Sequence, residues 1–145
     1  MTRTPLLQPT GPTTLVRTLA RFVLGAFLAY AGTSHLTFAR QEFVAQVPQF
    51  LPFSTDFVVL ASGVVEIVLG LSLMFLTRLR IPVGLATAAF FIAIFPGNIA
   101  QYVNHVNAFG LDTDTKRLVR LFFQPVLVAW ALWSTGAWAW LRRKI

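Results

Sequence analysis

The sequence predicts an all-α membrane protein: a four-transmembrane-helix bundle with an amphipathic interfacial segment between spans one and two. Hydrophobic residues make up 56% of the 145 residues and charged residues only 12%. The mean hydropathy of +0.68 lies outside the range of ordinary soluble domains. Four apolar windows are long enough to cross a hydrocarbon core of about 30 Å. They cover about residues 15–34, 57–76, 82–103 and 118–141.

These windows leave no room for a separate soluble domain. Residues 1–14, MTRTPLLQPTGPTT, are rich in Thr and Pro and are expected to form a disordered tail. Residues 15–145 are expected to form one transmembrane domain. The run Ala29–Ala31 resembles a signal-peptide cleavage site, but we expect the first span to be retained.

The basic residues predict the orientation of the bundle in the membrane. The net charge is +7, but the basic residues cluster at span ends without interleaved aromatics, so nucleic acid is not an expected partner. Eight basic residues fall on one side and four on the other, which predicts that both termini are cytoplasmic. The eight are Arg3, Arg17, Arg21, Arg78, Arg80, Arg142, Arg143 and Lys144, and the four are Arg40, Lys116, Arg117 and Arg120.

Small residues predict how the first two spans pack. Gly25, Leu28, Gly32 and His35 form one helical stripe in span one, which is expected to face a neighbouring helix. The connection 37–55 is long and apolar, and we expect it to form an amphipathic interfacial segment interrupted by prolines. Its apolar side would carry Phe43, Val47, Phe50 and Leu51, and its breaks would fall at Pro48 and Pro52.

An acid lies in the middle of the most apolar run, DFVVLASGVVEIVLGLSLMFL. Ser62, Glu66 and Gly70 are four residues apart, with Gly63 beside them, so Glu66 is expected to point into the bundle. An ionised acid at this depth is costly unless it is paired. We therefore expect Glu66 to be protonated or hydrogen-bonded to a side-chain amide.

Spans three and four each combine a proline with polar residues. Pro96 and Pro125 predict kinks. Asn98, Gln101 and His105 would form one polar stripe, and Arg117, Arg120 and Gln124 another. At a rise of 1.5 Å per residue, Asn98 and Gln124 lie roughly 8 to 9 Å below the outer boundary and Glu66 roughly one turn deeper. His35 comes out near the boundary itself, so its contact with Glu66 stays open.

Two interpretations of these polar residues remain. In the first, they line an outward-facing ligand pocket; its predicted ligand-binding residues are Glu66, Asn98, Gln124, His35 and Gln101. In the second, they are interhelical hydrogen bonds that hold the bundle together. His35 and His105 could also be solvated at helix ends. Arg117 and Arg120 are expected to contact lipid headgroups, with capture of an anionic ligand as the alternative.

The order of motifs resembles the DoxX family of small four-span bacterial membrane proteins. The resemblance runs from Leu15 to Trp140 through AGTSHLTF, FVAQVPQFLP, ASGVVEIVLGLSL, IAIFPGNIAQYVNH and RLFFQPVLVAWALW. The family patterns map onto Gly32, His35 and Leu36, then Gly63 and Glu66, then Phe95, Pro96 and Asn98, and finally Gln124 and Pro125. Many members carry a proline soon after the histidine, and here LTFARQ has none.

The resemblance implies a bacterial inner-membrane protein, and some relatives are subunits of quinone-linked oxidoreductases or of membrane redox complexes. The chain has no cysteine, so it cannot relay electrons through thiols or ligate an iron–sulfur cluster. We therefore expect no catalysis by this chain alone, no covalently bound cofactor and no metal. A quinone or a lipid is the expected ligand.

The leading hypothesis is an accessory or ligand-binding subunit that supports a quinone-linked membrane oxidoreductase. One alternative is a small proton-coupled transporter or lipid-binding protein in which Glu66 carries a proton. The other is a purely structural subunit of a larger membrane complex. The expected partners are membrane lipids together with other membrane subunits or a second copy of the chain.

Overall fold

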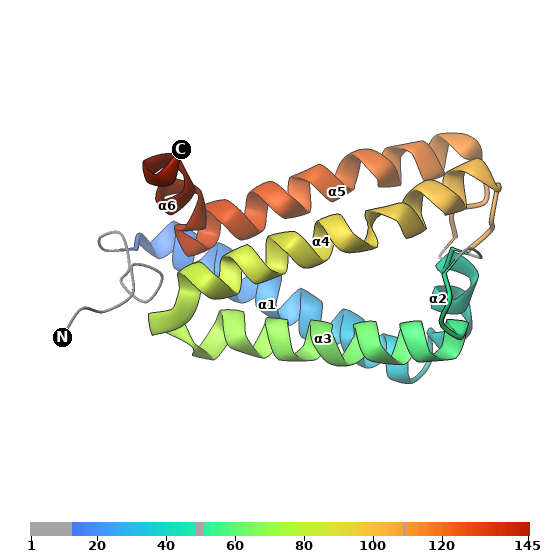
Figure 1. Ribbon diagram of the computed structural model, residues 1–145, viewed down its shortest axis with the longest axis horizontal. Helices are drawn as coiled ribbons and strands as arrows, with labels where there is room; N and C mark the ends of the chain where they lie inside the picture. Colours follow the sequence, from blue (N-terminus) through green and yellow to red (C-terminus); the bar gives the residue numbers. More distant parts are fainter. Residues whose placement is uncertain (1–12, 49–50, 109) are drawn as a thin grey trace.

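The protein is built of helices, as the sequence predicts. The computed structural model describes residues 13–48, 51–108 and 110–145. The predicted tail therefore lies, up to residue 12, outside the described residues, as does Phe50 of the predicted amphipathic segment. Figure 1 shows the helices α1 (Leu15–Leu36), α2 (Arg40–Gln46), α3 (Thr55–Phe75), η2 (Thr77–Leu79), α4 (Arg80–Val103), α5 (Asp114–Thr135) and α6 (Ala137–Lys144).

Four helices are long and apolar enough to cross a membrane: α1, α3, α4 with the preceding η2, and α5. The chain is a multi-pass membrane protein, and its prediction as a four-span bundle is confirmed. Large apolar side chains are exposed along all four helices, as expected for surfaces in contact with lipid. Examples are Phe22, Val68, Ile92 and Phe122.

The fourth span differs most from its predicted bounds of 118–141. It begins at Asp114 because Thr113 caps the helix, its Oγ1 accepting a hydrogen bond from the backbone N–H of Lys116 at 3.2 Å. It ends at Thr135 because Gly136 adopts a left-handed backbone conformation with φ of 83°. The aromatic and basic residues after Gly136 form the separate helix α6 rather than the end of the span.

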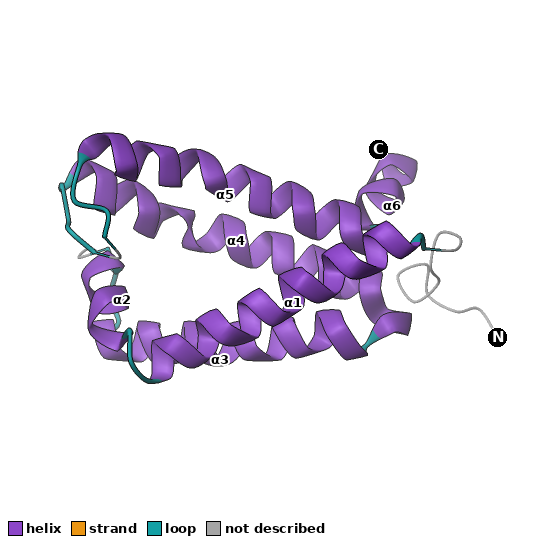
Figure 2. Cartoon of the chain, turned by 180° about the vertical axis from the view of Figure 1, so that it is seen from behind, coloured by secondary structure: helices purple, strands orange, loops and turns teal. Residues whose placement is uncertain are grey.

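The long helices form two pairs, α1 with α3 and α4 with α5 (Figures 1 and 2). We call the end that holds the start of α1, η2 and α6 the proximal end, and the end that holds α2 and residues 104–113 the distal end. The pairs lie close together at the proximal end and further apart at the distal end, where α2 lies between them. A shared core from all four helices closes the proximal half; it contains Leu24, Leu28, Leu73, Ala88, Phe91, Leu127 and Ala131.

Glycines bring α1 and α3 into backbone contact, which confirms the predicted packing role of the small-residue stripes. A Cβ atom on Gly32 would lie 2.5 Å from the carbonyl oxygen of Gly63, and one on Gly25 would lie 2.6 Å from that of Gly70. No residue with a side chain fits at either point without moving a backbone. These two contacts fix the antiparallel register of the pair.

Candidate functional site: a polar pair in a membrane cavity

A cavity of about 480 Å³ lies between the two helix pairs in the distal half of the bundle. Its lining is mostly apolar, with a few polar side chains, which is the usual make-up of a small-molecule site. His35 of α1 and Ser62 and Glu66 of α3 contribute polar groups from one wall. Asn98 of α4 and Arg120 of α5 contribute them from the other.

The cavity is open at the side of the bundle. Phe27 of α1 lines it although 49% of that residue is exposed, and Ala93 and Pro96 of α4 line it from exposed positions. These residues lie within spans, on surfaces that face the hydrocarbon region. At these residues the cavity meets the surface of the bundle.

Glu66 and His35 form a buried pair at the deep end of the polar wall. Glu66 is 5% exposed and points into the bundle, as predicted. Its Oε2 lies 3.1 Å from His35 Nε2, within ion-pair distance, but the orientation is not that of a regular hydrogen bond. Within the described ranges Glu66 Oε2 has no hydrogen-bond partner. A ligand in the cavity could therefore hydrogen-bond this oxygen, which accepts when the acid is ionised and donates when it is protonated.

The other ring nitrogen of His35 carries a hydrogen. Nδ1 lies 3.3 Å from the carbonyl oxygen of Val59 and 3.0 Å from Ser62 Oγ, and that hydroxyl already donates to Val59. Both neighbours therefore accept, so Nδ1 carries a hydrogen. The pair can take up one further proton, either on the Glu66 carboxyl group or on His35 Nε2. The pair can hold or release a proton without a change in the surrounding hydrogen bonds.

The glycine register explains a contact that sequence reasoning left open. The depths expected from the sequence assumed that the spans end at the same level. That assumption placed His35 near the membrane boundary, away from Glu66. In the structure α3 extends further toward the distal end than α1 does, because Gly32 packs on Gly63. The signal was present in the sequence, since Gly25 and Gly32 are seven residues apart and so are Gly63 and Gly70. Matching the two spacings in antiparallel register would have brought His35 beside α3.

The segment around α2 covers the distal mouth of the cavity. The ring of Phe43 lies against that of His35, with centroids 3.4 Å apart and planes tilted by 34°. Val47, Pro48 and Leu51 also line the cavity. Helix α2 ends at Gln46 because the residue before Pro48 is restricted to extended conformations, and Val47 has ψ of 125°. The described members of the predicted apolar side, Phe43, Val47 and Leu51, thus line the cavity.

On the opposite wall, Gln124 links the two proline-containing helices. Its Nε2 donates to the carbonyl oxygen of Phe91 at 2.6 Å, in the part of α4 where Pro96 removes a backbone donor. Its Oε1 accepts from Asn98 Nδ2 at 3.3 Å and from Arg120 Nη1 at 3.1 Å. Gln124 therefore has both amide atoms occupied.

This arrangement corrects two expectations about the amides. Asn98 lines the cavity, but Gln124 lies behind it and does not line it, since its amide reaches the backbone of α4 instead. Neither amide hydrogen-bonds Glu66 within the described part of the chain; the partner of the acid is His35. Gln124 thus matches the structural interpretation, whereas Asn98 remains a candidate ligand-binding residue.

Gln101 of α4 and Arg117 of α5 bond the distal loop and do not line the cavity. Gln101 Nε2 donates to the carbonyl oxygens of Val106 and Ala108 at 3.3 and 3.4 Å. Arg117 is 5% exposed and bonds the carbonyl oxygen of Val106, Asp114 and Asn107. The predicted headgroup contact of Arg117 stays a prediction, and in the structure its guanidinium bonds Val106, Asn107 and Asp114. Gln101, predicted to bind ligand, instead orders the backbone of the loop.

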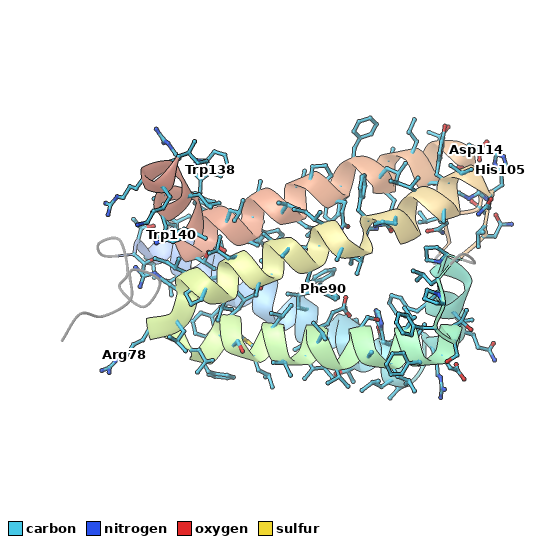
Figure 3. All side chains as sticks on the ribbon, viewed as in Figure 1. Arg78, Phe90, His105, Asp114, Trp138 and Trp140 are labelled. Atoms are coloured by element: carbon cyan, nitrogen blue, oxygen red, sulfur yellow. The ribbon has the colours of Figure 1, made fainter. Side chains whose placement is uncertain are left out.

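Two further side-chain pairs bridge groups at the same loop. His105 and Asp114 lie together at the distal end in Figure 3, with Nδ1 and Oδ1 2.7 Å apart. Lys116 Nζ donates to Asp112 at 2.8 Å and lowers the pKa of that carboxyl below its ordinary value. His105 has φ of 54° and lies beyond the end of α4, so it does not continue the predicted polar stripe.

Arg120 was the functional group whose position sequence reasoning missed. It was expected at the headgroups, but it lines the cavity, with its guanidinium 5.9 Å from the ring of Phe123. Arg120 and Gln124 are four residues apart and therefore lie on one face of α5. This spacing was the sequence signal that Arg120 faces the interior of the bundle. Among the described residues there is no group of three or more His, Asp and Glu side chains that could hold a metal ion.

Comparison with known proteins places the chain in a family. No curated protein and no solved structure matches it. A family model described as "Domain of unknown function (DUF8561)" matches residues 24–135, a range that contains the cavity, the Glu66–His35 pair and the two glycine contacts. The match covers most of the sequence, and the chain belongs to this family.

Proposed function

We propose that the protein is an accessory, ligand-binding subunit of a quinone-linked membrane oxidoreductase. Its ligand is a quinone-like or lipid-like molecule that occupies the cavity between the helix pairs. The observation that carries the proposal is the unpartnered Oε2 of Glu66, held 3.1 Å from His35 Nε2 on the wall of a cavity that is otherwise mostly apolar. A buried acid and imidazole beside a ligand-sized cavity are typical of a functional site.

The two walls suit a ring with polar groups on opposite edges. A quinone presents two carbonyl oxygens, and each needs a donor. On one wall the proton shared by Glu66 and His35 supplies a donor. On the other, Arg120 has five N–H groups, of which one bonds Gln124, and Asn98 has a second amide hydrogen. The apolar lining between the walls would hold the ring and the start of a hydrophobic tail.

The accessory role rests on composition and on resemblance. The sequence has no cysteine with which to relay electrons. Its motif order resembles the DoxX family, some of whose members are subunits of quinone-linked oxidoreductases. The same resemblance, with eight basic residues against four, favours the bacterial inner membrane with both termini in the cytoplasm. In that orientation the cavity lies in the outer half of the bilayer.

The test is retention of ligand during purification. The chain is purified in mild detergent, and bound quinones and lipids are extracted and quantified per mole of protein. We expect Glu66→Gln to retain at least fivefold less quinone than the unmodified chain. Asp56→Asn is the matched control, because it makes the same chemical change on α3 at an exposed position outside the cavity lining. Equal retention by both variants and the unmodified chain would refute the quinone site.

A second candidate function follows from the proton shared by Glu66 and His35. A small transporter could couple the charge of this pair to binding of a substrate in the cavity. We rank it lower because the sequence has no inverted repeat of the kind that supports alternating access. Uptake into proteoliposomes that requires both a pH gradient and Glu66 would favour the transporter. A purely structural subunit would be favoured if neither ligand retention nor uptake responds to Glu66→Gln.

A further inference from the structure

The proximal end carries many basic residues and no acidic side chain. Its described basic residues are Arg17, Arg21, Arg78, Arg80, Arg142, Arg143 and Lys144. The five acids of the sequence are Glu42, Asp56, Glu66, Asp112 and Asp114, and they lie in or near the distal end or in the cavity. Figure 3 shows Arg78 and Trp140 at the proximal end, opposite Asp114. No carboxylate side chain can therefore neutralise this end.

Membrane topology explains only the exposed members of this group. Arg78, Arg142 and Arg143 are exposed, as expected for residues that hold one end of a bundle on the cytoplasmic side. Arg21 is only 2% exposed and Arg80 only 8%. A buried guanidinium normally has a carboxylate or another anion beside it, because burial removes the water that solvates its charge. Topology requires no buried arginine.

Among the described residues, Arg21 has no anionic partner. Its Nη1 atom is buried without a hydrogen-bond partner in the described part of the chain. Its guanidinium carbon lies 5.7 Å from the ring of Phe22, and its charge is repelled by that of Arg80, which is also repelled by Arg17. Residues 1–12, 49–50 and 109 contain no acid, so they cannot supply a carboxylate side chain.

Other buried donors lie at the same end. Ser134 Oγ, near the end of α5, and Trp140 Nε1, on α6, are also buried without a partner among the described residues. Helix α5 meets the start of α1 here, since Trp130 Nε1 donates to the carbonyl oxygen of Ala20 at 2.9 Å and Arg17 lies 6.0 Å from the ring of Trp133. At the proximal end, three buried donor groups, on Arg21, Ser134 and Trp140, thus have no acceptor among the described residues.

We propose that the proximal end binds a phosphate-bearing anion through Arg21 and Arg80, with Arg17 as a third contact. A phosphate offers several acceptor oxygens to the planar fork of an arginine and neutralises the repulsion between Arg21 and Arg80. The sources of this chemistry are an anionic phospholipid headgroup and a soluble phosphate. The site lies at the opposite end of the bundle from the cavity, and its test does not depend on the proposed function.

The experiment measures phospholipid binding to the full chain by native mass spectrometry from detergent micelles. Phosphatidylglycerol and phosphatidylcholine, which differ in net charge, are added at matched concentrations. We expect phosphatidylglycerol to bind at least tenfold more tightly. Arg21→Gln and Arg80→Gln should each reduce that preference about tenfold. The control is Arg78→Gln, which removes the same charge from an exposed position at the same end and should change binding less than twofold.

The outcomes separate a built site from diffuse attraction and from lipid specificity. A stabilising shift of the thermal midpoint by millimolar inorganic phosphate would identify a soluble phosphate as sufficient, whereas a response to phosphatidylglycerol alone would identify the lipid. An equal loss of the preference for phosphatidylglycerol in Arg21→Gln and Arg78→Gln would overturn the proposal. Equal binding of the two lipids, together with no response of the thermal midpoint to phosphate, would also overturn it. If Arg21→Gln does not fold, Arg21→Lys keeps the charge without the fork and should lose at least threefold in preference; an unchanged preference overturns the role of Arg21.

Discussion

The two walls of the cavity are built in different ways. The α1–α3 wall is held by backbone contact, with Gly32 against Gly63 and Gly25 against Gly70. The α4–α5 wall is held in its distal half by a side-chain amide, because Gln124 connects Asn98, Arg120 and the backbone of Phe91. Backbone contact leaves no freedom to adjust, whereas side-chain hydrogen bonds can be exchanged for others. The wall that carries the acid–imidazole pair is thus the rigid one.

Substitution of a contact glycine should have the largest effect on stability. Gly32→Ala places a methyl group 2.5 Å from the carbonyl oxygen of Gly63 and 2.9 Å from the backbone nitrogen of Ile67, so the helices must separate. We expect a loss of about 3 kcal/mol, at the upper end of the usual cost of overpacking. Reversible unfolding in micelles, followed by circular dichroism, measures it.

The control for this substitution is Ala26→Val, which adds volume on an exposed face of the same helix and should change stability little. Alanine has a higher helix propensity than glycine, so propensity alone would make Gly32→Ala stabilising. A stable Gly32→Ala variant would show that the α1–α3 wall can adjust, and the contrast between the walls would be lost.

Loss of the amide on the other wall should have an intermediate effect. Gln124→Leu keeps the size of the side chain but leaves the Phe91 carbonyl without this donor, and Asn98 and Arg120 without this acceptor. We expect a loss of about 1 to 2 kcal/mol, as for interhelical hydrogen bonds in membranes. Gln41→Leu, at an exposed position on α2, is the control for the change in polarity. A loss of stability larger than that of Gly32→Ala would show that the α4–α5 wall depends more on its amide than the α1–α3 wall does on its glycine contact.

The acid–imidazole pair should behave as one unit. Measured by double-mutant cycle, His35→Gln and Glu66→Gln are expected to be coupled by about 1 kcal/mol, because Glu66 Oε2 and His35 Nε2 are 3.1 Å apart. The readout is the same unfolding equilibrium with each single variant and the double variant. Additive effects would mean that the two groups act independently, and that the rigid wall only brings them close.

The smallest effect is expected outside both walls. Arg40 Nη2 and Asp56 Oδ2 are 3.1 Å apart, but both side chains are largely solvent-exposed at the distal rim. Exposed ion pairs contribute little, so Arg40→Gln should change stability by less than about 0.5 kcal/mol. A larger value in the same assay would place Arg40 in the structural support of the cavity mouth.

Much of the fold was predictable because the bilayer imposes simple requirements. Apolar length gave the four spans, and the glycine stripes gave the faces of α1 and α3 that pack together. The end of α5 was not predictable from hydropathy, since α6 continues with aromatic residues and only the conformation of Gly136 separates the two helices. Hydropathy measures how apolar a segment is, whereas a helix end depends on one residue's backbone.

The candidate site was predictable in part. The direction of Glu66 followed from its helical neighbours Ser62 and Gly70. The partner of Glu66 did not follow, because the depths were estimated from span ends while the register is fixed by glycine contacts. Arg120 lines the cavity and Gln101 bonds the distal loop, and neither position followed from the sequence. Sequence position tells which face of a helix a residue occupies but not whether a loop folds back onto that face.

Because the cavity opens at the side of the bundle, its occupancy by a hydrophobic ligand would depend on the ligand concentration in the bilayer rather than in water. Phe27 and Ala93 connect the cavity with the lipid-facing surface, so a hydrophobic ligand would arrive from the bilayer. Such a compound is enriched in lipid over water by its partition coefficient, and each buried methylene adds about 0.8 kcal/mol to that enrichment. A low intrinsic affinity is then sufficient for a filled site. Ligand affinities for this cavity should therefore be expressed as mole fractions of ligand in the lipid or detergent. An affinity expressed per volume of solution would change with the amount of detergent present.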